Sequence, residues 1–141
     1  MTLSLLDRSN YFKGLLLLIG KDEKITQPEN DLIKKLGKVL GFEKYFVEEA
    51  INGLFENEYI KKDPPKFSSS IFAEAFLKDG IKLALADNDL ASAEYEWLIT
   101  VAANNNINNQ WLETQFRALT HLDYEKDVLA SNLEILPFLA N

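Results

Sequence analysis

One stretch of this chain recurs in its second half at a constant offset, and the repeat constrains the fold more than any other feature. Residues 22–29, Asp-Glu-Lys-Ile-Thr-Gln-Pro-Glu, return as 87–94, Asp-Asn-Asp-Leu-Ala-Ser-Ala-Glu (87 − 22 = 65 and 94 − 29 = 65). Apolar positions keep this offset over about thirty residues without a gap, which predicts a duplicated structural unit. The matched pairs are Ile25 with Leu90, Leu32 with Trp97, Ile33 with Leu98, Leu36 with Val101, Phe42 with Ile107, Phe46 with Trp111, Val47 with Leu112, Ile51 with Phe116 and Leu54 with Leu119.

The length of the chain, 141 residues, suits one compact domain with a substantial core. An apolar fraction of 47% argues against disorder. Pro64 and Pro65 interrupt the chain between the two copies, because proline lacks the helical N–H and disfavours a helical residue before it. We therefore predict a single domain over residues 1–141, with related halves at about 9–57 and 69–121 and a linker at about 58–68.

Helix starts and stops can be recognised in both copies. Thr26 and Glu29 have the spacing of a capping box, and Gly41 can end a helix with a positive φ. In the second copy, asparagines at 104–106 replace that glycine, and Asn108 can cap the next helix. No stretch shows strand alternation between hairpin turns, so the prediction is an all-α domain. The expected helices cover 14–20, about 27–40, about 43–57, about 70–86, about 93–103, about 109–120 and a last segment through Val128, Leu129, Leu133 and Ile135 that ends before Pro137.

Charge and composition limit the partners and the compartment. The net charge of −7 argues against nucleic acid and anionic membrane surfaces, and favours cations or basic partners. The apolar run 14–20 is shorter than the roughly 20 residues that span a bilayer, and no small-residue cleavage site follows it. We expect a buried helix there, with no direct membrane insertion. The chain has no cysteine, which excludes thiol chemistry and fits a cytoplasmic protein.

The paired acidic segments are the candidate sites. Their carboxylates could bind a hard cation such as Ca²⁺, Mg²⁺ or Mn²⁺, or they could only cap helix N-termini and favour the helix dipole. The candidate metal ligands are Asp22, Glu23 and Glu29 in the first copy and Asp87, Asp89 and Glu94 in the second. An EF-hand is excluded because Ala91, Ser92 and Leu98 stand where it needs an oxygen ligand, a glycine and a glutamate. If one copy binds a cation, we expect the second, because Lys21 and Lys24 add positive charge to the first.

The remaining residue types favour structure over catalysis. His121 is the only histidine, and neither a nucleophile with a partnered base nor a glycine-rich phosphate loop accompanies it, so we expect no enzyme. Trp97 and Trp111 stand where the other copy has Leu32 and Phe46, and both are expected to be largely buried in the core. Helical periodicity also directs Val39, Phe46 and Ile71 inward.

The pattern resembles a known family. A helix, then Asp-acid-x-apolar-x-x-x-Glu at residues 22–29, a periodic helix closing with Gly41-Phe42, and a second copy at the constant offset are similar to the TerB-like domains. These occur in tellurite-resistance TerB proteins and in the N-terminal region of the membrane-linked co-chaperone DjlA. The resemblance covers about residues 12–119. It implies a compact bundle of about seven helices built as two related halves, a link to tellurite stress, and divalent-cation binding by the six acidic residues named above.

Two functions remain open at the level of sequence. The first is a non-enzymatic, stress-associated TerB-like module that acts through an unidentified protein partner, with a divalent cation at the acidic loops. The second is a helical protein that binds a small molecule or lipid in a cavity between the two halves. A large apolar cavity would favour the second, and a filled core with an exposed surface patch would favour the first.

Overall fold

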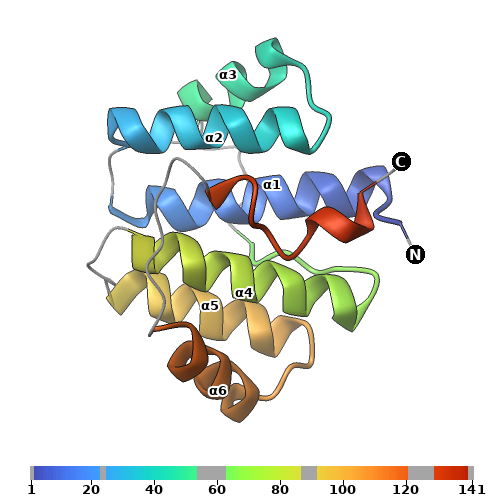
Figure 1. The fold of residues 1–141 in the computed structure, drawn as a ribbon, viewed down its shortest axis with the longest axis vertical. Coiled ribbons are helices and arrows are strands. Elements are labelled where there is room, and N and C mark those ends of the chain that lie inside the picture. The colour runs from blue at the N-terminus through green and yellow to red at the C-terminus, as the bar shows by residue number, and fades with distance from the viewer. Residues whose placement is uncertain (1, 23–24, 54–62, 87–91, 121–128, 140–141) are drawn as a thin grey trace.

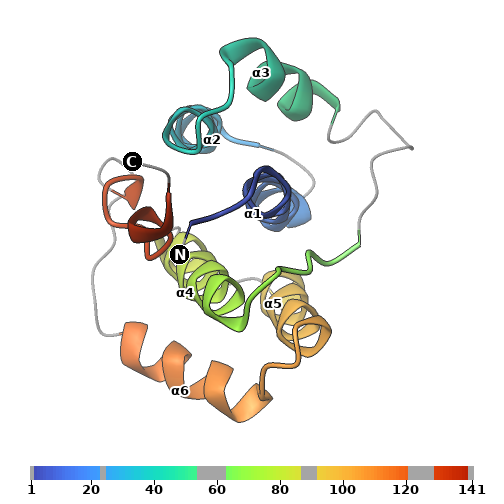
Figure 2. The same cartoon turned by 90° about the vertical axis from the view of Figure 1, so that its right-hand side faces the viewer.

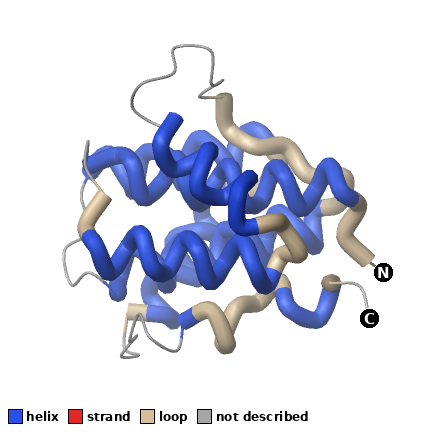
Figure 3. The backbone as a smooth tube through the Cα atoms, turned by 90° about the horizontal axis from the view of Figure 1, so that it is seen from above, coloured by secondary structure: helices blue, strands red, loops and turns tan. Residues whose placement is uncertain are grey.

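The computed structural model describes residues 2–22, 25–53, 63–86, 92–120 and 129–139. Every regular element among these residues is a helix, so the predicted all-α class is confirmed (Figure 3). Six α-helices and two short 3₁₀-helices have bounds within the described ranges. They are α1 (Leu5–Ile19), η1 (Gly20–Asp22), α2 (Gln27–Val39), α3 (Lys44–Gly53), α4 (Ser70–Ala86), α5 (Ser92–Asn104), α6 (Asn109–Leu119) and η2 (Leu136–Phe138).

The six α-helices form two sets of three, α1–α3 and α4–α6, and the first helix of each set belongs to a central pair (Figures 1 and 2). Helices α1 and α4 pack against each other at the centre of the bundle. Helix α2 packs on α1 and α3 packs on α2, while α5 packs on α4 and α6 packs on both α4 and α5. The third helix of each set, α3 or α6, therefore lies at the outside of the molecule (Figure 2).

The helix boundaries repeat with the predicted offset. The three helices of the second set begin at this offset from those of the first, since 70 − 5, 92 − 27 and 109 − 44 all equal 65. The ends of α2 and α5 agree as well. Gly41 and Asn106, which the same offset relates (106 − 41 = 65), are the residues with positive φ among those described, at 88° and 58°. The local signals of the repeat thus produce the same helix plan twice.

The predicted caps explain these boundaries. Thr26 and Glu29 form a capping box at the start of α2, and Asn108 accepts a hydrogen bond from the Gln110 N–H at 2.6 Å at the start of α6. After α2, the Phe42 N–H donates to the Gly37 carbonyl at 2.9 Å. The corresponding bond after α5 joins the Ile107 N–H to the Ala102 carbonyl at 2.8 Å. Both are Schellman-type ends, which require the left-handed residue between helix and loop.

The core lies along α1 and α4. The apolar run 14–20 falls inside α1 and its extension η1, and its four leucines are buried, as predicted. Tyr11 of α1 meets Phe76 of α4 edge to face, with ring centroids 5.6 Å apart and both side chains fully buried. Trp97 of α5 is also buried in this core, in agreement with the prediction.

Several predicted core positions lie at the surface instead. Phe46 is 48% exposed, and Val39 and Ile71 are also exposed. Trp111, the counterpart of Phe46 (111 − 46 = 65), is partly buried and packs against the core, so it lies less deep than Trp97. For Phe46 the physical reason is the outer position of α3, where a helix can bury only the stripe that faces the bundle. Val39 is the last residue of α2 and Ile71 is the second residue of α4, so both lie at helix ends.

The predicted last helix is corrected over residues 130–135. Leu129 is helical, but residues 130–135 form turns rather than a helix, and Pro137 lies inside η2 instead of following a helix end. The N–H groups of Glu134 and Ile135 donate to the carboxylate of Asp79 on α4, at 2.7 and 3.3 Å. These amides are therefore bound by a side chain rather than by carbonyls of a helix. We call residues 129–139 the C-terminal strap.

Gly37 sets the close approach of α2 to α3. A Cβ added at Gly37 would lie 2.3 Å from Cγ2 of Val47. We therefore expect Gly37→Ala to destabilise the fold by about 1–3 kcal/mol through overpacking, even though alanine favours a helix over glycine by about 0.5–1 kcal/mol. Urea unfolding measures this loss.

A double-mutant cycle provides the control for Gly37. Val47→Ala removes the methyl groups that the new Cβ would meet, so Gly37→Ala should be less harmful in that background. Additive losses in the double variant would mean that the two side chains do not limit the helix spacing.

Candidate binding groove

The predicted metal ligands are described only in part. Glu29 is buried, and its Oε1 accepts hydrogen bonds from the N–H and the hydroxyl of Thr26, at 3.1 and 2.8 Å. The carboxylate thus caps α2, which is the structural explanation of this residue. Glu94, at the equivalent position in α5 (94 − 29 = 65), is likewise buried.

The other four acidic candidates do not permit a test. Glu23, Asp87 and Asp89 lie outside the described residues, as does the side chain of Asp22. Within the described part of the chain, no three His, Cys, Asp or Glu side chains are grouped so that they could hold a metal ion. A cation site at the second acidic loop therefore stays a prediction.

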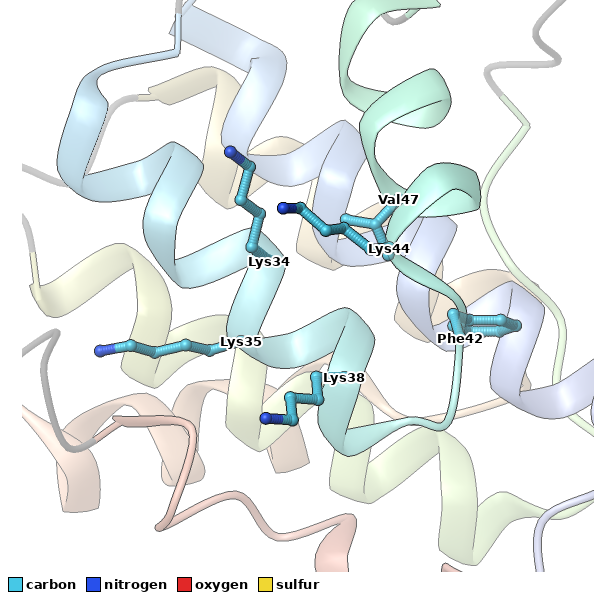
Figure 4. A pocket seen from close by; sticks show the side chains of 6 residues that line it. All are labelled: Lys34, Lys35, Lys38, Phe42, Lys44 and Val47. Atoms are coloured by element: carbon cyan, nitrogen blue, oxygen red, sulfur yellow. The ribbon is translucent and has the colours of Figure 1, made fainter.

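A groove lies between α2 and α3 on the surface of the described part of the chain. Its volume is about 490 Å³. Three of its lining residues lie on α2, two on α3, and Phe42 lies in the turn between the helices (Figure 4). The lining residues are Lys34, Lys35, Lys38, Phe42, Lys44 and Val47, and we call this feature the lysine groove.

The groove has a fixed apolar base. Val47 is buried against Gly37, so the two helices cannot shift freely along each other. The Phe42 ring stacks on Phe46 with centroids 5.0 Å apart and also meets Phe12 of α1 at 5.6 Å. These aromatic contacts hold the turn between α2 and α3 against the core. The groove is therefore preformed in the folded chain.

Positive charge lines the groove from both sides. All four lysines are exposed, and Figure 4 shows the amino groups of Lys34 on α2 and Lys44 on α3 in the same region between the helices, while Lys35 and Lys38 extend away from α3. Among the described residues, the ion pair at the groove is Lys44 with Glu48, at 3.9 Å between largely exposed side chains. Such a surface pair contributes about 0–1 kcal/mol, and no ion pair is seen for Lys34, Lys35 or Lys38 in the described part of the chain. The groove is thus a basic surface on a chain whose net charge is −7.

The second half of the molecule provides an internal comparison. Adding the repeat offset to the positions of the four lysines gives uncharged residues in every case. The apolar positions Phe42 and Val47 become Ile107 and Leu112 and so remain apolar. The same helix plan thus forms with and without the lysines, and the fold does not require them. Lys34 corresponds to Ile99, Lys35 to Thr100, Lys38 to Ala103 and Lys44 to Asn109.

Sequence patterning alone did not identify the groove. Lysines 34, 35 and 38 lie on the polar face of α2, a pattern that is typical of any solvated helix. Lys44 belongs to the next helix, and only the tertiary arrangement brings it to the same place. The sequence does contain one signal for the groove: the first copy has four lysines at positions where the second copy has none.

A second polar cluster lies in the core around Asp79. Burial raises the pKa of Asp79 to about 7, although hydrogen bonds from Tyr11, Glu134 and Ile135 and the charge of Lys82 act in the opposite direction. The Tyr11 hydroxyl donates to Asp79, and burial followed by the Asp79 charge raises the Tyr11 pKa as well. All of these donors belong to the chain itself, so the cluster serves to hold the strap on α4 rather than to bind a substrate.

Comparison with known protein families, curated proteins and solved structures found no significant match. The resemblance to TerB-like domains therefore remains a prediction from the residue pattern. Over the residues that the structure describes, no helix has the length and apolar character needed to cross a bilayer.

Proposed function

We propose that this protein is a non-enzymatic, cytoplasmic helical module that binds an acidic segment of a partner protein through the lysine groove. The observation that carries the proposal is the lysine cluster itself, which the matched positions of the second half lack. Four like charges on one groove repel each other, and a ligand with carboxylates would relieve that repulsion. The net acidity of the chain favours basic partners in general, but the groove reverses this preference locally.

The chemistry of the groove supports a binding role. The described cluster with the most perturbed ionisation, around Asp79, is buried and bound by the chain's own donors. The groove itself offers lysines and apolar side chains, and none of the six lining residues is a carboxylate, a histidine or a hydroxyl nucleophile. Charge and shape at the groove serve recognition.

Charge reversal across the groove tests the proposal. We expect Lys34→Glu/Lys44→Glu to weaken binding of fluorescein-labelled poly-L-glutamate at least about tenfold, measured by fluorescence anisotropy at low salt. Glutamate suits both sites, because position 34 is exposed on α2 and position 44 begins α3, where a carboxylate favours the helix dipole. The fold of the variant is checked by circular dichroism and thermal unfolding.

A variant of equal net charge is the matched control. Lys66→Glu/Lys78→Glu changes the total charge by the same amount outside the groove, in the segment before α4 and on α4 itself. This control should keep the affinity within about twofold of the wild type. Equal losses in both double variants would show that total charge, not the groove, controls binding, and the proposal would be wrong.

A further inference from the structure

We propose that the segment recognised by the lysine groove is an amphipathic helix, with carboxylates at helical spacing on one face and an aromatic or branched aliphatic residue beside them. This inference rests on the proposed function and names the class of its partner. Three features of the groove lead to it: the spacing of its lysines, the exposed apolar surface next to it, and the absence of a strand in the described part of the chain.

The spacing of the lysines matches a helical ligand. Lys34 and Lys38 are four residues apart on α2, which corresponds to a rise of about 6 Å. Carboxylates at positions i and i+4 of a second helix repeat the same rise, so two acids on one face can pair with these two lysines. Lys44 reaches toward Lys34 from α3, so an acid between the helices is held from both walls (Figure 4).

An exposed apolar surface continues from the groove. Phe46 stacks on the groove residue Phe42 and is 48% exposed. Val39, at the end of α2, is exposed as well. A ligand that carried only carboxylates would leave these side chains in water, whereas an apolar anchor beside the acids would bury them. Charge and apolar surface together therefore fit an amphipathic segment.

A helix satisfies its own backbone when it enters such a site. An extended peptide usually gains affinity by adding a strand to a sheet edge, and the described residues include no strand that could accept one. An extended segment in this groove would bury N–H and C=O groups against lysine stems and aromatic rings that cannot pair with them. The groove between two helices fits the packing of a third helix.

Polyanions other than proteins fit less well. Specific binding of nucleic acid uses a broader basic footprint, on the order of 6–10 phosphate contacts, than four lysines on a chain of net charge −7 supply. An anionic membrane surface would likewise be repelled by the remainder of the chain. An acidic helix brings only a few charges and meets only the groove. Anionic vesicles and a second copy of the chain are therefore alternatives that the experiment must exclude.

Three labelled synthetic peptides of equal length and net charge test the inference. The first is a helix with glutamates at i and i+4 and a phenylalanine beside them. The second replaces the phenylalanine with alanine. The third has the composition of the first in an order that scatters the acids around the helix. In fluorescence anisotropy, the wild-type protein should bind the first peptide at least about tenfold tighter than the other two.

Protein variants locate the contact. Lys34→Glu/Lys44→Glu should lose the first peptide, while Lys66→Glu/Lys78→Glu should retain it. Phe46→Ala and Phe46→Ser remove exposed apolar surface beside Phe42, and they should weaken binding of the first peptide but not of the second, so that the preference between the two peptides disappears. Thermal unfolding confirms that each variant is folded, and two further substitutions of the same side chain, Phe46→Gln and Phe46→Leu, keep the test valid if one variant unfolds the chain.

The possible outcomes separate the two proposals. Equal binding of all three peptides, still dependent on Lys34 and Lys44, would overturn the amphipathic helix and leave the acidic-segment function standing. Binding that ignores the lysines altogether would overturn both. Lysine-dependent binding to vesicles of phosphatidylserine and phosphatidylcholine, or lysine-dependent self-association in sedimentation, with no binding of the first peptide, would replace the protein partner by a membrane or by a second copy.

Discussion

Replacing Trp97 with alanine is expected to lower the free energy of unfolding by about 3–5 kcal/mol, the range for large core truncations. Trp97 is 6% exposed and packs in the core of α4 and α5, at the position that Leu32 occupies in the first half. The Nζ of Lys21 lies 4.5 Å from the centroid of the indole and adds a cation–π contact from the first half. The truncation would therefore remove both core volume and a link between the two helix sets.

Two comparison variants make this measurement specific. The indole Nε1 of Trp97 is buried without a hydrogen-bond partner among the described residues, so Trp97→Phe removes an unsatisfied donor and should cost less than the alanine variant. Trp111→Ala should cost about 1–2 kcal/mol, because Trp111 is only partly buried on the outer helix α6. Urea unfolding that ranks Trp111→Ala equal to or above Trp97→Ala would show that the indole of Trp97 is not part of the core.

The parts of the fold that follow from neighbouring residues could be predicted from the sequence. The capping box at Thr26 and the left-handed stops at Gly41 and Asn106 depend on side chains within a few positions, and all are present in the structure. Burial on the outer helices depends on how many neighbours a helix has. Apolar periodicity placed Phe46 on an inward face without indicating that the bundle ends there.

The strap and the groove could not be predicted, for a different reason. The turn at Glu134 is set by Asp79, which lies 55 residues earlier in the chain. The leucines and the one isoleucine of the strap fit a helical period equally well, so local sequence could not decide between a helix and turns. The basic surface was hidden by the net charge of −7, which averages over segregated charges. Only the crossing of α2 and α3 shows that Lys44 joins the lysines of α2.

Removing the acceptor at the strap should be the second large effect. We expect Asp79→Ala to lower the free energy of unfolding by about 2–4 kcal/mol, because the Tyr11 hydroxyl and the N–H groups of Glu134 and Ile135 would lose their acceptor. Amide hydrogen exchange at 134 and 135 should accelerate before the rest of the chain unfolds. Glu134→Gln is the control, because it removes the ion pair between Glu134 and Lys82. The Glu134 side chain is 44% exposed, so this change should cost about 1 kcal/mol or less.

The same carboxylate predicts a pH dependence with a definite sign. The Asp79 pKa is raised from its ordinary value of 3.8 to about 7, chiefly by burial, so the folded chain keeps this proton between about pH 4 and 7 while the unfolded chain releases it. The stability contributed by this proton is complete below about pH 4 and is lost as the pH rises through about 7.

Urea unfolding from pH 4.5 to 8 on the wild type and on Asp79→Asn checks this dependence. Tyr11, Lys82 and Glu134 also face Asp79, and they are present in both proteins, so the difference between the two profiles isolates the carboxyl group. The stability of the wild type should fall relative to that of the asparagine variant up to about pH 7 and then run parallel to it. Profiles that stay parallel over the whole range would mean that Asp79 is already ionised in the folded state at pH 4.5, held by its three donors against the cost of burial.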